Sequence, residues 1–213
     1  MKSSHLIRRA TTLLAATLLT LSTVTANAWA STSQGTDNEA QATYQKTPAS
    51  KKQSSNNDKE KNMEKILFVN GSPNRDGNTA TLAKALLKGK EYDTLMLTDY
   101  RINQYGQKLE GDQLDEVLDR MKQADIVVMG SPVYWHNICA SVRTLMERCY
   151  GYLPEGAFKG KRLFFVYQGA APTKMMIEAG EYSMSRFAGM YGFTYEGMAN
   201  DRKGAEALGE KLK

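Results

Sequence analysis

The chain has 213 residues, of which 41% are hydrophobic and 24% charged, and its formal net charge is +5. Residues 1–62 hold eight of the 28 Lys and Arg and four of the 23 Asp and Glu, so residues 63–213 carry a charge of only +1. Because this nearly neutral part shows no basic stripe, we expect no nucleic-acid partner.

The first thirty residues have the pattern of an export signal. Lys2, Arg8 and Arg9 precede an uncharged run with the apolar centre LLAATLLTLSTV, which closes with Ala28-Trp29-Ala30. A basic start, a short apolar middle and an A-x-A end are typical of a cleaved signal peptide. The alternative is an uncleaved anchor, but the run is marginal for the roughly 20 apolar residues that a spanning helix needs. We therefore predict a signal peptide over 1–30, a secreted or cell-envelope protein, and no membrane span after cleavage.

Residues 31–62 are rich in Ser, Thr, Gln, Asn and Lys and hold almost no large apolar residues, which predicts a disordered polar linker. Residues 63–213 are long enough for one domain with its own core. Two questions stay open. Arg8-Arg9 lacks the Phe usual two places beyond a twin-arginine pair, so the export route is undecided. Met63 begins MEKILFVNGSPN, which reads as the start of a cytoplasmic form.

Strand-like and helix-like runs alternate through residues 63–213. Continuous apolar runs predict buried strands at 65–70, 92–97, 125–130, 162–167 and 193–198. Helical periodicity lies between them, around Leu82–Leu86, over 114–121 with Asp112 as N-cap, over 139–153, over 173–190, and after Asp201. The pattern predicts an α/β fold with a five-stranded parallel sheet and helices on both faces.

The two cysteines, Cys139 and Cys149, fall on one predicted helix. Ten residues at 1.5 Å per residue separate them by about 15 Å, which is too far for a disulfide. We predict small core side chains, and no zinc or iron–sulfur motif.

The loop VNGSPNRDGNT (69–79), between the first strand and the first helix, has the composition of a phosphate site. It lacks the G-x-G-x-x-G of dinucleotide folds and the Lys of a Walker A loop. Exposed N–H groups at a helix start favour an anion. The alternative is a plain polar turn capped by Asn78 or Thr79. The donors are Ser72, Asn74, Asn78 and Thr79, with Gly71 and Gly77 allowing close approach of the backbone.

The loops after the third and fourth predicted strands suit a flat ring. GSPVYWHN (130–137) crowds aromatic side chains at a strand end, either to stack on a ligand or to form a buried corner. YQGAAP (167–172) offers Gln168 beside small residues. In open α/β sheets, ligands lie at the carboxyl ends of the strands. Together the three loops indicate a mononucleotide with a planar ring.

The domain resembles the flavodoxin-like NAD(P)H-dependent FMN reductase and quinone reductase family. NGSPNRDGNTATLA is similar to the family's phosphate loop, G-S-P-x-x-x-G-N-T, and GSPVYWHNICASVRTLMER to its P-V-Y-W segment and following helix. The resemblance implies a three-layer α/β/α fold, a homodimer, and an FMN site. It places Ser72, Asn74, Gly77, Asn78 and Thr79 at the phosphate, Pro132, Val133, Tyr134 and Trp135 at the ring, and Gln168 and Gly169 at the ring's polar edge.

The implied activity is an FMN-dependent oxidoreductase passing reducing equivalents from NADPH or NADH to a small acceptor such as a quinone or a flavin. If the protein is exported, another donor would be needed, because NAD(P)H is scarce outside the cytoplasm. The alternative is a flavodoxin-like electron carrier, but such carriers are usually markedly acidic. Iron–sulfur members carry cysteines after the second strand. This chain has TDYRINQYGQ there, so we predict flavin alone and no metal.

Five further residues lie in or near these loops. His136, the only histidine of the domain, is a candidate proton donor to the acceptor, with an exposed rim position as the alternative. Phe164 and Phe165, like the pair Met175-Met176, are predicted to lie in the core.

Overall fold

The computed structural model describes residues 64–213, so the predicted signal peptide and linker lie outside the described residues. The strands are β1 (Ile66–Asn70), β2 (Asp93–Met96), β3 (Ile126–Tyr134), β4 (Asn137–Ile138), β5 (Arg162–Gln168) and β6 (Thr194–Ala199). The helices are α1 (Asn78–Leu86), α2 (Leu114–Gln123), α3 (Ala140–Cys149), α4 (Lys174–Tyr191) and α5 (Arg202–Gly209), with short 3₁₀ turns at Leu97–Asp99 and Glu210–Leu212.

Five strands form a parallel sheet in the order β2-β1-β3-β5-β6, and β4 pairs antiparallel with the end of β3. β2, which follows β1 in the chain, pairs with one edge of β1, and β3 pairs with the other edge. Strand order therefore reverses between β1 and β3, which is where flavodoxin-like sheets place their ligand. The predicted parallel α/β sheet is confirmed.

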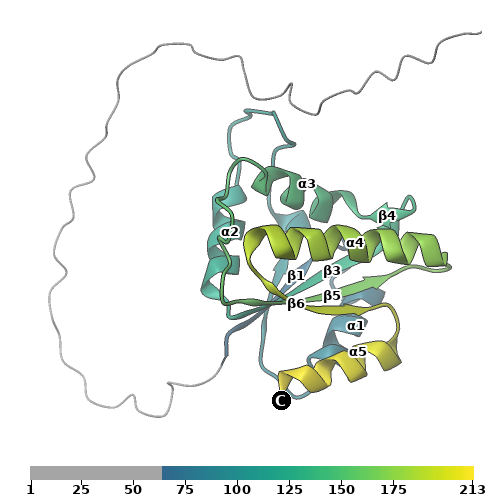
Figure 1. Cartoon of the computed structure of the whole chain (residues 1–213). Coiled ribbons are helices and arrows are strands. Elements are labelled where there is room, and N and C mark those ends of the chain that lie inside the picture. Colours follow the sequence, from purple (N-terminus) through teal and green to yellow (C-terminus); the bar gives the residue numbers. More distant parts are fainter. Residues whose placement is uncertain (1–63) are drawn as a thin grey trace, which may run out of the picture. The chain divides into compact units, whose positions relative to one another are not determined.

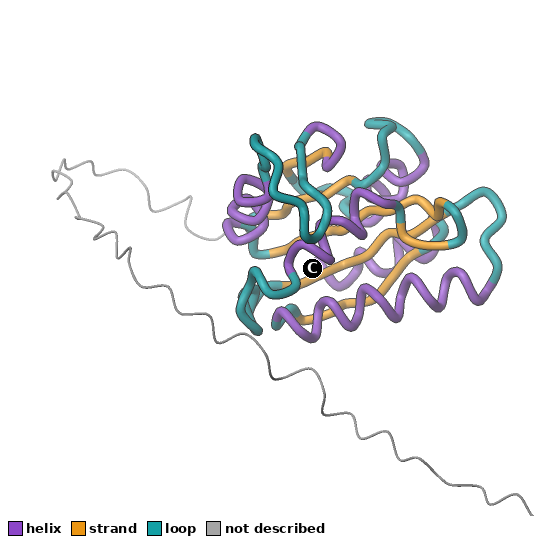
Figure 2. Tube along the Cα trace, turned by 90° about the horizontal axis from the view of Figure 1, so that it is seen from above, coloured by secondary structure: helices purple, strands orange, loops and turns teal. Residues whose placement is uncertain are grey.

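Helices cover both faces of the sheet, as Figures 1 and 2 show. α1 and α5 lie on one face, while α2, α3 and α4 lie on the other. Alternate residues of the central strands point to opposite faces, so each face has its own core. Phe68 and Phe164 belong to the core under α1 and α5, whereas Phe165 belongs to the core under α3 and α4.

Most predicted elements are present, with their bounds displaced by a few residues. α4 begins at Lys174 with Thr173 as its N-cap, and α5 follows Asp201, whose side chain accepts from the Gly204 N–H. Asp112 also bonds a first-turn N–H of α2, that of Leu114, although Gln113 is the N-cap. Both cysteines are free and buried, so the prediction of small core side chains without a disulfide is confirmed. Burial also raises the pKa of the Cys149 thiol to about 12.

Two predictions about individual elements were wrong. The stretch 130–137 is not a loop: β3 continues to Tyr134, turns, and returns as β4. The pair Met175-Met176 is not in the core, because Met175 is 75% exposed and Met176 half-buried in the first turn of α4. Phe164 and Phe165 are fully buried as expected.

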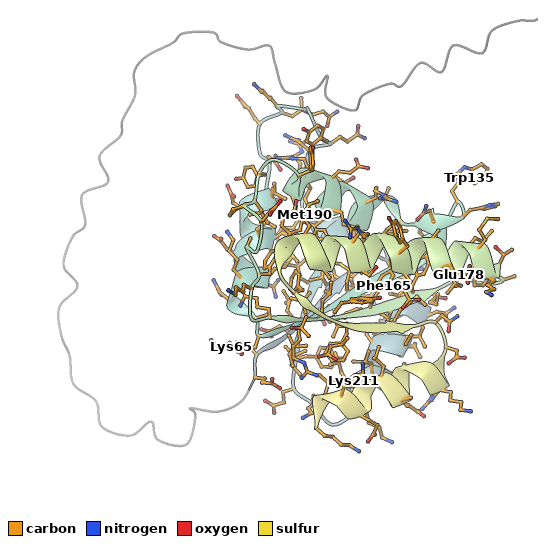
Figure 3. The ribbon with its side chains drawn as sticks, in the orientation of Figure 1. Lys65, Trp135, Phe165, Glu178, Met190 and Lys211 are labelled. Carbon is orange, nitrogen blue, oxygen red and sulfur yellow. The ribbon has the colours of Figure 1, made fainter. Side chains whose placement is uncertain are left out.

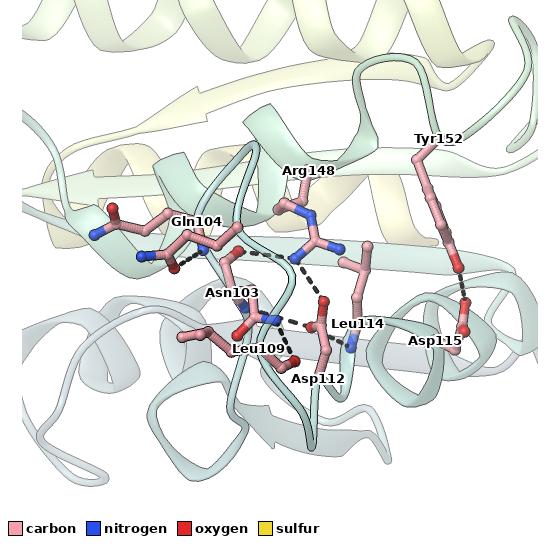
Figure 4. A network of polar contacts seen from close by, with 9 residues as sticks. Asn103, Gln104, Leu109, Asp112, Leu114, Asp115, Arg148 and Tyr152 are labelled. Atoms are coloured by element: carbon pink, nitrogen blue, oxygen red, sulfur yellow. Dashed lines mark hydrogen bonds and ion pairs between the residues drawn. The ribbon is translucent and has the colours of Figure 1, made fainter.

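The segment between β2 and α2 is held by a polar network (Figure 4). The Arg148 guanidinium lies 2.6 Å from the Asp112 carboxylate and donates to the Asn103 carbonyl at 2.9 Å. The buried Asn103 side chain donates to the Leu109 carbonyl at 2.7 Å. The segment is thus anchored to the C-terminal end of α3.

The pKa of Asp112 reports the strength of this anchor. Partial burial raises the pKa, but hydrogen bonds from Arg148 and from the Asn103 and Leu114 N–H groups outweigh it and lower the pKa below its ordinary value. Because the pKa of Asp112 is lower in the folded protein than in the unfolded chain, its ionised carboxylate stabilises the domain at pH values above the ordinary pKa near 3.9. This stabilisation is lost as the pH falls through the pKa of the folded state.

Arg148→Met should therefore destabilise the domain by about 2–3 kcal/mol at pH 7, because it leaves the Asp112 carboxylate and the Asn103 carbonyl without their charged donor. Urea unfolding measures the loss, and the difference from wild type should narrow toward pH 3 as Asp112 becomes protonated. Arg186→Met, at an exposed position on α4, is the matched control and should change stability little. A pH-independent loss in Arg148→Met would show that the packing of the side chain, not its charge, stabilises the segment.

Candidate functional site

The three predicted loops meet at one edge of the sheet. β1, β3 and β5 run parallel, so Asn70, Tyr134 and Gln168 all lie at the carboxyl ends of their strands. In Figure 3 Trp135 stands out from this end, and Lys65 lies at the opposite end. Residues far apart in sequence are thereby brought around the point where strand order reverses.

The phosphate-loop candidate is shaped by two short-range hydrogen bonds. The Asn70 Oδ1 accepts from the Ser72 N–H at 2.9 Å, and the Ser72 Oγ accepts from the Asn74 N–H at 3.2 Å. Asn70 and Ser72 are buried, whereas Asn74 is exposed. Ser72 therefore fixes the bend of the loop, with Asn70 holding it from the strand. Asn70 was missed in the sequence, although an amide ending an apolar strand was a signal for it.

The start of α1 is left open. Gly77 is its N-cap, no side-chain hydrogen bond caps it, and its first turn has no acidic residue. The alternative of a polar turn capped by Asn78 or Thr79 is therefore not what the structure shows. First-turn N–H groups have no partner within a helix, and the helix dipole favours an anion there by about 0.3–1 kcal/mol. The geometry fits a phosphate group.

The charged side chains around this loop are paired with one another. Arg75 lies 2.5 Å from Asp99, and Lys84 lies 3.1 Å from Asp76. These pairs are solvent-exposed, so each contributes little to stability. The donors that face an incoming anion are consequently the neutral groups of the loop and of α1.

Gly71 and Gly77 serve the fold of the loop. A Cβ on Gly71 would lie 2.3 Å from the Val142 Cγ2, so the glycine lets the chain pass close against α3 as it leaves β1. The Gly71 carbonyl accepts from the Ser141 hydroxyl at 2.7 Å. A Cβ on Gly77 would lie 2.9 Å from the Asn74 Cβ, which makes Gly77 a requirement of the tight bend. Gly71 thus allows a close approach of α3.

The aromatic segment forms a hairpin that presents two side chains to solvent. Tyr134 pairs with Asn137, which leaves Trp135 and His136 as a two-residue turn. Trp135 is 96% exposed and Tyr134 is 48% exposed. The alternative of a buried aromatic corner is therefore excluded for these two residues. Pro132 is buried and Val133 half-buried, so they support the hairpin from below.

The turn itself is held in an unfavourable backbone conformation. Trp135 and His136 are the two non-glycine residues with positive φ among residues 64–213, at 46° and 68°. Two-residue hairpins with positive φ at both positions favour Asn-Gly, and bulky residues there are strained. His136 is exposed, with its ring 6.0 Å from that of Trp135, so it sits at the rim of the site.

The double substitution Trp135→Asn with His136→Gly should therefore stabilise the domain by about 1–2 kcal/mol, since it removes strain at two positions and sacrifices no buried contact. Thermal unfolding measures the gain. Trp135→Phe, which keeps a bulky residue at positive φ, is the control and should give no gain. Equal stability of the double variant and the wild type would show that the turn is unstrained.

The third loop closes the site from the β5 side. A Cβ on Gly169 would lie 2.9 Å from the Val133 Cβ, so this loop lies directly against the hairpin strand. The Gln168 side chain reaches α1, where its Nε2 donates to the Thr79 Oγ1 at 3.1 Å. The structure thus brings together all three predicted loops, but it directs Gln168 toward Thr79.

Two hollows differ in size and position. A hollow of about 200 Å³ adjoins the start of α1 and is lined by Asn78, Thr81, Leu82, Gln168, Gly169 and Asn200. A larger one, of about 840 Å³, lies at the amino end of the sheet around Lys65, Asp93 and Arg120. Ligands of such sheets bind at the carboxyl ends, so we assign the site to the smaller hollow and its surroundings. Asn200, after β6, is a lining residue that the sequence did not reveal.

Comparison with known proteins agrees with this geometry. Residues 64–195 match the family described as NADPH-dependent FMN reductase. The chain belongs to this family. An iron–sulfur flavoprotein of Methanocaldococcus jannaschii is 33% identical over 98 residues, covering 39% of the chain and 51% of the relative. An iron–sulfur flavoprotein of Archaeoglobus fulgidus is 27% identical over 176 residues, covering 70% and 78%. The chain spans about half the length of the first of these two relatives.

Among solved structures, the Trp repressor binding protein of Bacillus subtilis superposes with a TM-score of 0.56 at 18% identity, covering 70% of the chain and 98% of that protein. At this identity the likeness shows the fold. It confirms the flavodoxin-like three-layer arrangement.

The residues of this FMN reductase family member fit an FMN molecule. An uncapped helix start without carboxylates suits the phosphate, and two exposed aromatic side chains at the adjoining strand end suit a planar ring. Within residues 64–213 no cluster of three or more His, Cys, Asp or Glu could hold a metal. In the same part of the chain, no helix has the length and apolar character needed to cross a membrane.

Proposed function

We propose that the domain is an FMN-dependent oxidoreductase that takes reducing equivalents from NADPH or NADH and delivers them to a small acceptor such as a quinone or a flavin. The observation that carries the proposal is the meeting of an open helix start and an exposed aromatic hairpin at the switch point of the sheet. The family match supports the cofactor and the donor.

FMN, when bound, would supply the redox chemistry of hydride and electron transfer. The residues of the chain would bind and orient it. The N–H groups of Asn78 and Thr79 would hold the phosphate, next to the bend that Ser72 and Asn70 shape. Ser72 and Asn74 keep that bend closed through their mutual hydrogen bond.

At the ring end, Tyr134 and Trp135 would lie against a flat ring and shield it from water. Pro132 and Val133 support this hairpin from the sheet side, and Gly169 allows the loop after β5 to lie close to Val133. His136 lies at the rim of the site, and we propose it as the proton donor to the acceptor. We assign His136 to the acceptor side because its exposed turn position leaves it free of the core.

We propose a flavin-only protein, because the segment between β2 and α2 contains no cysteine. Asn103, Asp112 and Arg148 hold that segment by a hydrogen bond and an ion pair. The charge of +1 on residues 63–213 favours an enzyme over an acidic electron carrier.

The proposal includes export through residues 1–30, with the second start at Met63 as the source of a cytoplasmic form. Cell fractionation of the full-length gene product, with mass determination of each form, tests both. A product beginning at Ser31 outside the cytoplasm supports cleavage, while a product beginning at Met63 supports the second start.

We include a homodimer in the proposal. It is supported by exposed apolar side chains on two elements that contact each other, the β3–β4 hairpin and α4. Trp135 is almost fully exposed on the hairpin, Met175 on α4 is 75% exposed, and α4 contacts β4. Light scattering of the purified chain gives the oligomeric state, and a monomer at all concentrations would contradict this part.

The deciding experiment is an anaerobic titration of the FMN-loaded chain with NADPH and then NADH, followed by the visible flavin spectrum. Prompt bleaching by either nucleotide supports the oxidoreductase. A bound flavin that stays oxidised with both would favour the electron carrier or a different donor. A chain that binds no FMN would contradict the proposal.

A further inference from the structure

Gln168 and Thr79 are joined across the site by a hydrogen bond that local sequence does not predict. The Gln168 Nε2 donates to the Thr79 Oγ1 at 3.1 Å, linking the end of β5 with the first turn of α1, 89 residues away. Thr79 is 1% exposed, and Gln168 is half-buried. A side-chain bond in this position ties the loop after β5 to the helix start that faces the anion.

The Thr79 side chain is fixed from a second side by packing. A Cβ on Gly130 would lie 2.9 Å from the Thr79 Cγ2, so the threonine methyl fills the space beside β3. With its methyl against β3 and its oxygen bonded to Gln168 of β5, the branched side chain is held in one orientation from two sides. The position of its hydroxyl oxygen is therefore set by the fold before any ligand arrives.

The chemistry of a hydroxyl decides what this arrangement can do. A threonine oxygen accepts up to two hydrogen bonds and donates one. Because Gln168 is the donor in their bond, the hydrogen of Thr79 is not used there and remains for an acceptor. Thr79 is the second residue of α1, so that acceptor is an anion at the helix start.

We infer that Gln168 is a positioning residue for the phosphate end of the cofactor: through Thr79 it orients a hydroxyl donor, and so helps the protein distinguish FMN from riboflavin, which lacks the phosphate. The inference rests on the proposed FMN site and gives Gln168 a role different from the ring-edge contact that the family resemblance implied.

The test is the affinity of the full chain for FMN and for riboflavin, each measured by quenching of flavin fluorescence, in wild type, Gln168→Leu, Thr79→Val and the double variant. Each single variant should bind FMN about tenfold more weakly, which corresponds to about 1.4 kcal/mol, and the double variant no more weakly than the singles. Riboflavin affinity should change less than twofold. Thr79→Ser, which keeps the hydroxyl, should retain most of the preference for FMN.

Matched controls remove the same groups elsewhere. Gln123→Leu lies at the amino end of the sheet, and Ser183→Ala removes a hydroxyl that bonds a helix carbonyl of α4. Both should leave the affinities for FMN and riboflavin unchanged, and thermal unfolding of every variant establishes that each is folded.

Three outcomes would overturn the inference. Equal loss of FMN and riboflavin affinity in Gln168→Leu would place the residue at the ring, and no loss of either would remove it from the site. Additive losses in the double variant would show that Gln168 and Thr79 act separately. Failure of the wild-type chain to bind either flavin is a different result, because it overturns the proposed function itself.

Discussion

Replacing Gly180 with alanine should destabilise the domain by about 2–3 kcal/mol, the range expected when a methyl group is forced into a packed core. Gly180 lies in the middle of α4 and is buried. A Cβ there would lie 2.2 Å from the Tyr167 Cε1 and 2.6 Å from its Cζ, so the ring or the helix must move.

Tyr167 has no room to yield. Its side chain is fully buried, and its ring stacks on that of Phe165 with centroids 5.1 Å apart. The helix would have to lift from the sheet, which also disturbs the residue that follows Tyr167, namely Gln168. The usual gain of up to about 1 kcal/mol from replacing a helical glycine with alanine does not offset this clash.

Gly189 of the same helix is the matched control. Nothing lies within 4 Å of a Cβ built on it, so Gly189→Ala should stabilise the domain by about 0.5–1 kcal/mol. Urea unfolding of the two variants therefore separates close packing from helix propensity. A stabilised Gly180→Ala variant would show that α4 can move away from β5 without cost.

The elements that the sequence predicted correctly are those with a regular pattern. β1, β3 and β5 are continuous apolar runs because both faces of the central sheet are covered, and α4 has a threonine at its N-cap. β4 has two residues, too few to show a period, and its turn uses Trp135 and His136 where turn rules favour Asn-Gly. The turn propensities of these residues therefore do not predict a turn at this position.

The candidate site was predictable as a set of loops but not as a set of contacts. Parallel strands bring their carboxyl ends together, so Ser72, Trp135 and Gln168 were correctly placed at one edge of the sheet. Which side chain bonds which depends on the distance and tilt between elements that no local pattern records. The bond from Gln168 to Thr79 and the support of Ser72 by Asn70 are contacts of this kind.

The Gly71→Ala substitution should weaken FMN binding at least tenfold, because the phosphate loop cannot keep its place with a methyl group at this position. The new Cβ would lie 2.3 Å from the Val142 Cγ2, 2.9 Å from the Cys139 Sγ and 3.0 Å from the Gly130 carbonyl oxygen. Relief of such overlap costs about 1–3 kcal/mol, and a tenfold change in affinity is 1.4 kcal/mol. Fluorescence titration with FMN measures the loss.

A second substitution identifies the cause of that loss. Val142→Ala removes the methyl group that the new Cβ meets first, so Gly71→Ala with Val142→Ala should recover part of the FMN affinity, although the contacts with Cys139 and Gly130 remain. Gly189→Ala, far from any neighbour, should bind FMN as wild type does. If Gly71→Ala alone binds FMN normally, the loop is free to shift and α3 does not hold it in place. If instead affinity is lost and Val142→Ala recovers it, the glycine at the end of β1 is required because a helix lies against it, and the phosphate site depends on the position of α3.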